Sequence, residues 1–311
     1  MQKLIDNFVK RIDEEKIRVE GIAICSVNEK LAEYRWSPDL ARNIYSHTKS
    51  FTATAVGIAM DDGEISLEDK LIDYFPDKVI GKPSDGLMKI KLKHLLTMSS
   101  GFGKPLLMGA MRRAGDGMPD YLKYMLSQPV QAEPGSRFCY STADSILAAR
   151  MVEKRVGKRL TQYLYEKVFE PLNIGYPRWE HCPMGHPCGG GGMYLSLDNM
   201  MKLGQLYLNN GEWNGQKIVS PSWINKATSK QIDTPEQEDN NWLCGYGYQF
   251  WLSPYTNAYR ADGAHGQVTT VLPEAQLVVG IQCPEDFDSN MENQNFPKVR
   301  KVLHEEILTQ L

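Results

Sequence analysis

The sequence has no long apolar run, no excess of positive charge and few cysteines, and each absence excludes a class of protein. No stretch of the 311 residues approaches the roughly 20 apolar residues that a membrane-spanning helix needs. The formal net charge is -3, with 35 Lys and Arg against 38 Asp and Glu. This balance argues against nucleic acid or an anionic membrane as the main partner, because both require a concentrated positive field.

The beginning of the chain and the cysteines bear on the compartment. Residues 1–16 mix charges through their apolar positions, so they lack the apolar core of a signal peptide. The six cysteines are scattered and fall mostly at positions that look buried, which favours a reducing compartment over a disulfide framework. We therefore expect a cytoplasmic protein, and a processed export signal is the alternative that stays open.

Strand patterns occupy both ends of the chain, and helical patterns occupy its middle. We predict strands at 19–27, 31–36, 245–252, 258–263, 267–272 and 276–282, and helices at 1–16, 49–63, 92–101, 120–126, 145–157, 160–172, 196–211 and 298–311. The simplest architecture is an α+β fold in which an antiparallel sheet is built from both termini, flanked by helices, with a mainly helical inserted region. Residues 1–45 and 185–311 would form the sheet region and 46–184 the helical region, as one compact unit with the active-site cleft between them.

A serine and a lysine stand three positions apart where the first strands give way to a helix. Ser46 and Lys49 would lie on one face of that helix, within reach of each other. A lysine with a lowered pKa can take the proton of a serine hydroxyl, and a helix N-terminus supplies N–H groups for an oxyanion. The alternative for this pair alone is a helix cap and a solvated side chain.

Two further elements carry polar side chains at the ends of predicted structure. Tyr140 precedes the helix at 145–157, where its hydroxyl could shuttle protons, with neighbouring cations favouring a phenolate. The alternative is a tyrosine that packs on the first turn of the helix. His265 is flanked by small residues just before the strand at 267–272, where a strand N–H could act as a second oxyanion donor, although a lone histidine is more often structural.

Together these three elements resemble the serine β-lactamase and penicillin-binding superfamily, in particular its branch of class C β-lactamases, D-amino-acid peptidases, bacterial esterases and nylon-oligomer hydrolases. The resemblance covers nearly the whole chain, with further typical stretches at 63–77, 90–101, 189–220 and 245–251. It implies a β-lactamase-like fold, Ser46 as the acylated nucleophile and Lys49 as its general-base partner, from the Ser-x-x-Lys motif. Tyr140 takes the place of the tyrosine of Tyr-x-Asn, and His265-Gly266-Gln267 takes the place of Lys-Thr-Gly. The second oxyanion N–H would come from Val268, or from Gln267 if the register slips by one.

Two departures from the family pattern affect the expected substrate. Thr142 stands where Tyr-x-Asn has its asparagine, and His265 stands where Lys-Thr-Gly has its lysine. A histidine is neutral for much of the time near pH 7, so the permanent positive charge for a substrate carboxylate is lost. We therefore expect a serine hydrolase of an ester, an amide or a short peptide, without a cofactor or metal. A penicillin-binding-like covalent binder or sensor with little turnover is the alternative.

The remaining open points concern a cysteine and histidine cluster and a methionine-rich segment. His181, Cys182, His186 and Cys188 lie close together, but their spacing is not a common zinc-ligand pattern. The segment 103–131 contains Met108, Met111, Met118 and Met125, which would form either an adaptable apolar wall of the cleft or ordinary helix core. The substrate's identity and the oligomeric state stay open.

Overall fold

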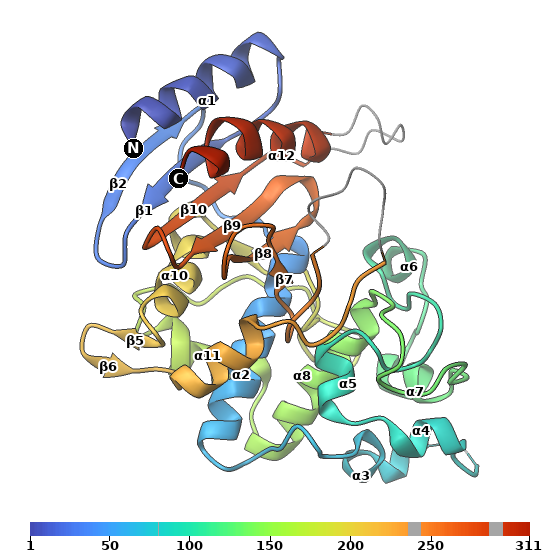
Figure 1. The fold of residues 1–311 in the computed structure, drawn as a ribbon. Coiled ribbons are helices and arrows are strands. Elements are labelled where there is room, and N and C mark those ends of the chain that lie inside the picture. The colour runs from blue at the N-terminus through green and yellow to red at the C-terminus, as the bar shows by residue number, and fades with distance from the viewer. Residues whose placement is uncertain (80, 236–243, 286–294) are drawn as a thin grey trace.

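Strands from both ends of the chain join in one antiparallel sheet, which confirms the predicted fold class (Figure 1). The computed structural model describes residues 1–79, 81–235, 244–285 and 295–311. The strand order in the sheet is β2-β1-β10-β9-β8-β7. The strands are β1 (Gly21–Cys25), β2 (Lys30–Arg35), β7 (Trp251–Leu252), β8 (Tyr259–Gly263), β9 (Gln267–Leu272) and β10 (Leu277–Gln282).

The sheet is covered on both faces, so its central strands are apolar at nearly every position. On β1, Ile22 and Ile24 belong to one apolar cluster, whereas Ala23 and Cys25 belong to the other. The first cluster lies under the two terminal helices, α1 (Gln2–Glu14) and α12 (Asn295–Glu306), which pack against each other. Figure 1 shows both helices on the same side of the sheet, with the two chain ends close together.

The other face of the sheet rests on the helical part of the molecule. Helix α10 (Leu197–Leu208) packs on β9 and β10, while α2 (Thr48–Asp61) packs on α8 (Thr142–Val156). Residues 48–59 of α2 are all buried, which is the behaviour of a helix at the centre of a core. The first residues of α2 follow directly from the turn that contains Ser46, so the core fixes the place of that turn.

The smaller elements complete the helical part and its edges. The remaining helices are α3 (Leu71–Tyr74), α4 (Asp85–Lys89), α5 (Leu92–Leu96), α6 (Gly109–Arg113), α7 (Tyr121–Leu126), α9 (Leu160–Leu164) and α11 (Pro221–Thr228). Single helical turns are formed by Tyr45–His47, Pro76–Lys78, Tyr165–Phe169, Ala264–Gly266 and Leu308–Gln310. Two short antiparallel pairs join β3 (Arg42–Asn43) with β4 (Tyr194–Leu195), and β5 (Glu212–Trp213) with β6 (Gln216–Lys217).

One predicted strand is largely wrong, and two helices begin earlier than predicted. The run 245–252 forms a strand only at its last two residues, because Gly245 and Gln249 have φ values of +117° and +64°, which extended backbone does not allow. Helix α8 begins at Thr142 instead of residue 145, and α12 already includes Asn295, which lies before the predicted start at residue 298.

Two simple properties of the described chain bear on its environment. All six cysteines lie within the described residues and are free thiols, four of them buried. None of the helices in the described ranges combines the length and the apolar character that crossing a membrane requires.

Candidate active site

Ser46 lies in a tight turn that leads directly into α2. The preceding residue, Tyr45, has a φ of +47°, and its N–H donates to Asn43 Oδ1 at 2.9 Å. Asn43 belongs to β3, which is held in register by β4. Ser46 itself is partly exposed, whereas the four residues after it are buried. The turn therefore presents the serine hydroxyl at the surface of a site whose floor is the core of the molecule.

Lys49 is 1% exposed, and its ammonium group is directed at the serine. Its Nζ lies 3.1 Å from Ser46 Oγ and donates to the carbonyl oxygen of Gly190 at 2.5 Å. Burial, together with the smaller effect of the nearby Arg112 charge, lowers the pKa of Lys49 to about 7, while Asp144 opposes the shift. A lysine in this state is partly neutral at physiological pH, so it can accept the serine proton.

Tyr140 stands next to the same two groups. It shares a hydrogen bond with Ser46, and Lys49 Nζ lies 5.0 Å from the centre of its ring. The ring stacks on Trp251 at a centroid distance of 5.5 Å. Burial raises the pKa of Tyr140, and only the Ser46 hydrogen bond opposes that shift. The phenolate expected from the sequence is therefore wrong for the resting site, where Tyr140 is a neutral phenol.

The backbone of the glycine run 189–192 passes close to Lys49. A Cβ on Gly190 would lie 2.7 Å from Thr142 Cγ2, and one on Gly189 would lie 2.4 Å from the Cβ of Ala149. The carbonyl of Gly189 also accepts a hydrogen bond from Thr52 Oγ1 at 2.6 Å. The backbone therefore passes close to α8, and this passage brings the Gly190 carbonyl to Lys49.

Asp144 is a buried charged group near the site that the sequence reading gave no role. It is 0% exposed and accepts a hydrogen bond from Ser100 Oγ at 2.8 Å. Burial raises its pKa to about 7, against the effects of Ser100 and Lys49. An aspartate in the first turn of a helix is ordinary in a sequence, because it favours the helix dipole. Its burial, which marks it as unusual, depends on the packing of α8 against α2.

Arg112 is a second charged group that the sequence reading missed. Its side chain is 7% exposed and forms an ion pair with Glu180, with an Nη2–Oε2 distance of 2.9 Å. Its Nη1 donates to the carbonyl of Leu107 at 2.7 Å. This fixed positive charge near Lys49 disfavours a second positive charge on the lysine. No motif in the sequence pointed to it, since α6 is a short helix in the methionine-rich segment.

Thr142 lies beside the glycine run and does not approach Lys49 through its hydroxyl. It is 3% exposed, and its Oγ1 contacts Met108 Sδ at 3.3 Å. Among the methionines of the segment 103–131, Met108 thus reaches the site, Met125 is fully buried core and Met118 is 59% exposed. Met108 therefore fits the predicted wall of the cleft, and Met125 fits the predicted helix core.

The His265 segment forms the turn between β8 and β9. His265 has a φ of +66°, and its ring lies 4.7 Å from that of Tyr45, which places it next to the nucleophile's turn. A Cβ on Gly266 would meet Cys283 Sγ at 2.6 Å, and Gln267 Nε2 donates to the carbonyl of Cys283 at 2.7 Å. Both residues therefore contact Cys283, the residue that follows β10.

The two residues predicted to supply the second oxyanion N–H lie at the start of β9. Val268 is paired with Asp262 of β8 on one side and with Ile281 of β10 on the other, while Gln267 is paired with Gly263 of β8. Their role as oxyanion donors stays a prediction. The backbone that meets the nucleophile's turn belongs to the end of β8, because a Cβ on Gly263 would lie 2.1 Å from the carbonyl oxygen of Ile44.

The histidines of the cysteine and histidine cluster are engaged separately. His186 Nδ1 lies 2.6 Å from Glu153 Oε2, and His181 Nδ1 lies 2.8 Å from the carbonyl oxygen of Trp179. Within the described ranges no group of three or more His, Cys, Asp or Glu side chains is arranged to hold a metal ion. His186 is therefore paired with α8, whereas His181 is paired with the backbone of its own loop.

Comparison with known proteins gives a consistent family. The family model described as Beta-lactamase matches residues 5–301. An uncharacterized protein of Mycobacterium tuberculosis is 24% identical over 262 residues, which cover 69% of this chain and 64% of that protein. The 6-aminohexanoate-dimer hydrolase of Paenarthrobacter ureafaciens is 23% identical over 300 residues, covering 88% of this chain and 76% of that enzyme.

Among solved structures, the penicillin-binding protein homologue from Pyrococcus abyssi superimposes with a TM-score of 0.75 at 21% identity. The match covers 99% of this chain and 77% of that one. At this identity the similarity establishes the fold.

Proposed function

The chain belongs to the beta-lactamase family, whose members are serine hydrolases, and on that premise we propose that it cleaves an ester or amide through an acyl-enzyme on Ser46. The observation that carries the proposal is the arrangement of Ser46 Oγ, 3.1 Å from a buried lysine whose pKa is lowered to about 7. A nucleophile, a base of suitable pKa and a neighbouring phenol are the groups that acyl transfer requires.

The proposed reaction has two halves, and in each half Lys49 and Tyr140 take up a proton and pass it on. Ser46 Oγ attacks the carbonyl carbon while its proton passes to Lys49 Nζ. The tetrahedral intermediate then collapses, the bond to the leaving group breaks, and the proton of Lys49 reaches the leaving group through Tyr140. Water repeats the sequence on the acyl-enzyme and releases the acid, with Lys49 and Tyr140 activating the water.

We propose that the oxyanion is held by the N–H of Ser46 and by an N–H of the turn Ala264–Gly266, in place of Gln267 or Val268. Support comes from the contact between Gly263 and the Ile44 carbonyl, which brings this turn to the nucleophile. Replacing Ala264 by proline removes one N–H, and Gly263 already has φ of -119° and ψ of 153°, which suit a residue before proline. We expect A264P to lose about 10²–10³-fold in kcat, with Ala264→Ser as the matched control that keeps the N–H.

The substrate class follows from the side chains around the nucleophile. His265 and Tyr45 occupy the edge where the resembling family keeps a lysine, so a substrate carboxylate has no permanent cation there. We therefore favour p-nitrophenyl esters and amides over β-lactams, and one relative is a 6-aminohexanoate-dimer hydrolase.

A panel of p-nitrophenyl acyl esters, D-amino-acid amides and nitrocefin tests this preference. Turnover of esters or amides with little turnover of nitrocefin supports it. Efficient turnover of nitrocefin would contradict the substrate preference, and a stable adduct without turnover of any substrate would replace the hydrolase by the covalent binder.

A further inference from the structure

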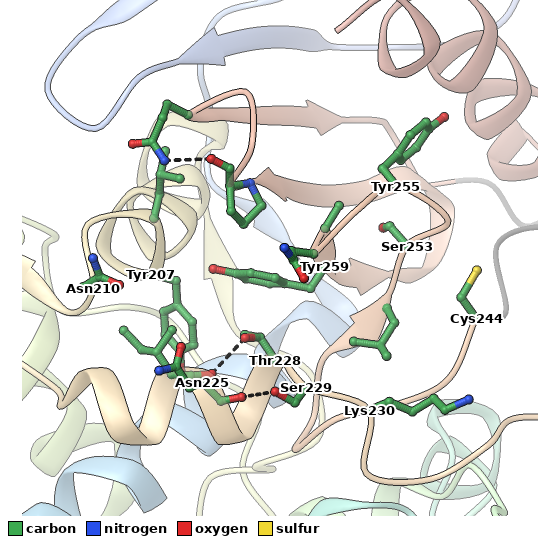
Figure 2. Close-up of a pocket in the computed structure, with 17 residues that line it drawn as sticks. Tyr207, Asn210, Asn225, Thr228, Ser229, Lys230, Cys244, Ser253, Tyr255 and Tyr259 are labelled. Atoms are coloured by element: carbon green, nitrogen blue, oxygen red, sulfur yellow. Dashed lines mark hydrogen bonds between the residues drawn. The ribbon is translucent and has the colours of Figure 1, made fainter.

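A pocket of about 600 Å³ opens on the helical face of the sheet, away from the nucleophile (Figure 2). It is lined by the end of α10, by α11 and the two residues after it, by the β7–β8 hairpin, and by the turn between β9 and β10. Its volume lies within the range of small-molecule sites. Tyr259, which lines it, and Gly263, which contacts the nucleophile's turn, lie on the same strand and are about 13 Å apart along it.

The hydroxyl of Tyr259 is the feature that distinguishes this pocket from an ordinary surface hollow. Tyr259 is only 4% exposed, and its ring is held edge-on by Phe250 at 5.8 Å. Figure 2 shows the ring lying across the pocket with the hydroxyl at its inner end, and no hydrogen bond joins it to the residues drawn. In the described part of the chain the hydroxyl has no hydrogen-bond partner, so it is free for a ligand.

The charges around the pocket exclude two classes of ligand. Lys230 is the one charged side chain in the described lining, and it is already paired with Asp233 at 2.5 Å. A phosphate or sulfate ester would need further cations, and a cationic ligand would need a carboxylate. The lining therefore favours a neutral ligand.

The remaining polar groups favour a ligand that both donates and accepts hydrogen bonds. Asn210 and Asn225 border the pocket with side-chain amides, which offer two donors and an acceptor each. Tyr255 adds an aromatic ring, held in place through its hydroxyl by His304. Amides and a phenol beside aromatic surface suit the hydroxyl groups and the apolar faces of a sugar ring.

We propose that this pocket binds a neutral carbohydrate of one or two rings, with Tyr259 hydrogen-bonded to the sugar. The site is separate from the nucleophile and does not depend on the proposed hydrolase function.

Calorimetric titration of the full chain with N-acetylglucosamine and with cellobiose tests the proposal. We expect saturable binding of at least one sugar, and a loss of about five- to tenfold in affinity for Tyr259→Phe, the factor of one neutral hydrogen bond. Tyr34→Phe, which changes an exposed tyrosine on β2, and Ser46→Ala are expected to bind as the wild type does.

Asn225→Ala provides a second variant, because Asn225 is exposed and its loss should not affect folding. This variant is expected to bind the same sugar with lower affinity. The proposal is overturned if neither sugar binds saturably, if Tyr259→Phe binds with unchanged affinity, or if Ser46→Ala abolishes binding. Saturable binding of an N-acetylated dipeptide amide in place of both sugars would also contradict it.

Discussion

At the scale of single residues, the protonation state of Lys49 controls whether Ser46 can be activated. Only the neutral amine accepts a proton, and a pKa of about 7 means that the neutral form is lost as the pH falls below 7. With an uncharged ester, we expect kcat/KM to fall about tenfold per pH unit below this point and to level off above it. Initial rates across a pH series measure the profile, and a rate independent of pH from 5 to 9 would contradict the role of Lys49.

Asp144 sets part of this pKa through its negative charge. The carboxylate raises the pKa of Lys49, so Asp144→Asn should move the acidic limb of the profile to lower pH. The plateau rate should also fall, because the ammonium formed during attack loses its counter-charge. Asp85→Asn is the control, since Asp85 is also a first-turn residue but is exposed on α4. If the acidic limb of the D144N profile lies at the same pH as in the wild type, Asp144 does not influence the pKa of Lys49.

The sequence predicted the residues of the site better than their surroundings. Ser46 and Lys49 could be paired from their spacing, because three positions on a helix fix the distance between side chains. Asp144 and Arg112 change the pKa of Lys49 through their charges, because all three side chains are buried near one another. That proximity arises from contacts between segments far apart in the chain. The predicted phenolate state of Tyr140 was wrong for the same reason, since the burial that raises its pKa arises from tertiary packing.

At the scale of elements, α2 carries the site because its residues 48–59 are all buried. Gly57 lies on this helix, and a Cβ there would come within 2.4 Å of Trp223 on α11. Overpacking of this kind costs about 1–3 kcal/mol, which outweighs the gain of about 1 kcal/mol from replacing a helical glycine by alanine. We expect Gly57→Ala to lower the free energy of unfolding in urea.

Gly175→Ala is the matched control for this substitution, because nothing lies within 4 Å of a Cβ at that position. Its free energy of unfolding should stay within about 0.5 kcal/mol of the wild type. Equal stability of both variants would mean that α2 and α11 do not pack as described.

Elements with one clear periodicity were predicted well, and those shaped by turns were not. The apolar runs at 19–27 and 276–282 became β1 and β10 because both faces of the sheet are covered. The run 245–252 is also rich in residues that favour strands, but Gly245 and Gln249 turn the chain. The order of the strands, which places β9 inside the sheet, is set by contacts between distant segments and could not be predicted from the sequence.

At the scale of the whole molecule, the terminal helices and the site belong to one sheet. Phe8 on α1 is fully buried in the cluster beneath α1 and α12, on the face opposite to α2. Phe8→Ala should lower the free energy of unfolding by about 3–5 kcal/mol, whereas Asn7→Ala on the exposed side of α1 should not. Activity per folded molecule should be unchanged.

We expect the urea transitions of F8A followed by circular dichroism and by activity to coincide, because we propose that the chain unfolds as one unit. Loss of activity at a lower urea concentration than loss of ellipticity would instead mean that the helical region and the sheet unfold separately.

The central claim is that Ser46 carries the acyl group, and intact-mass spectrometry after rapid mixing with a p-nitrophenyl ester tests it directly. The account predicts a mass increase of one acyl group on the wild type, located by peptide mapping to the segment containing Ser46. Ser46→Ala should show neither the adduct nor the release of p-nitrophenol, with losses of several orders of magnitude in rate. An adduct on another residue, or an unchanged rate in S46A, would contradict the account.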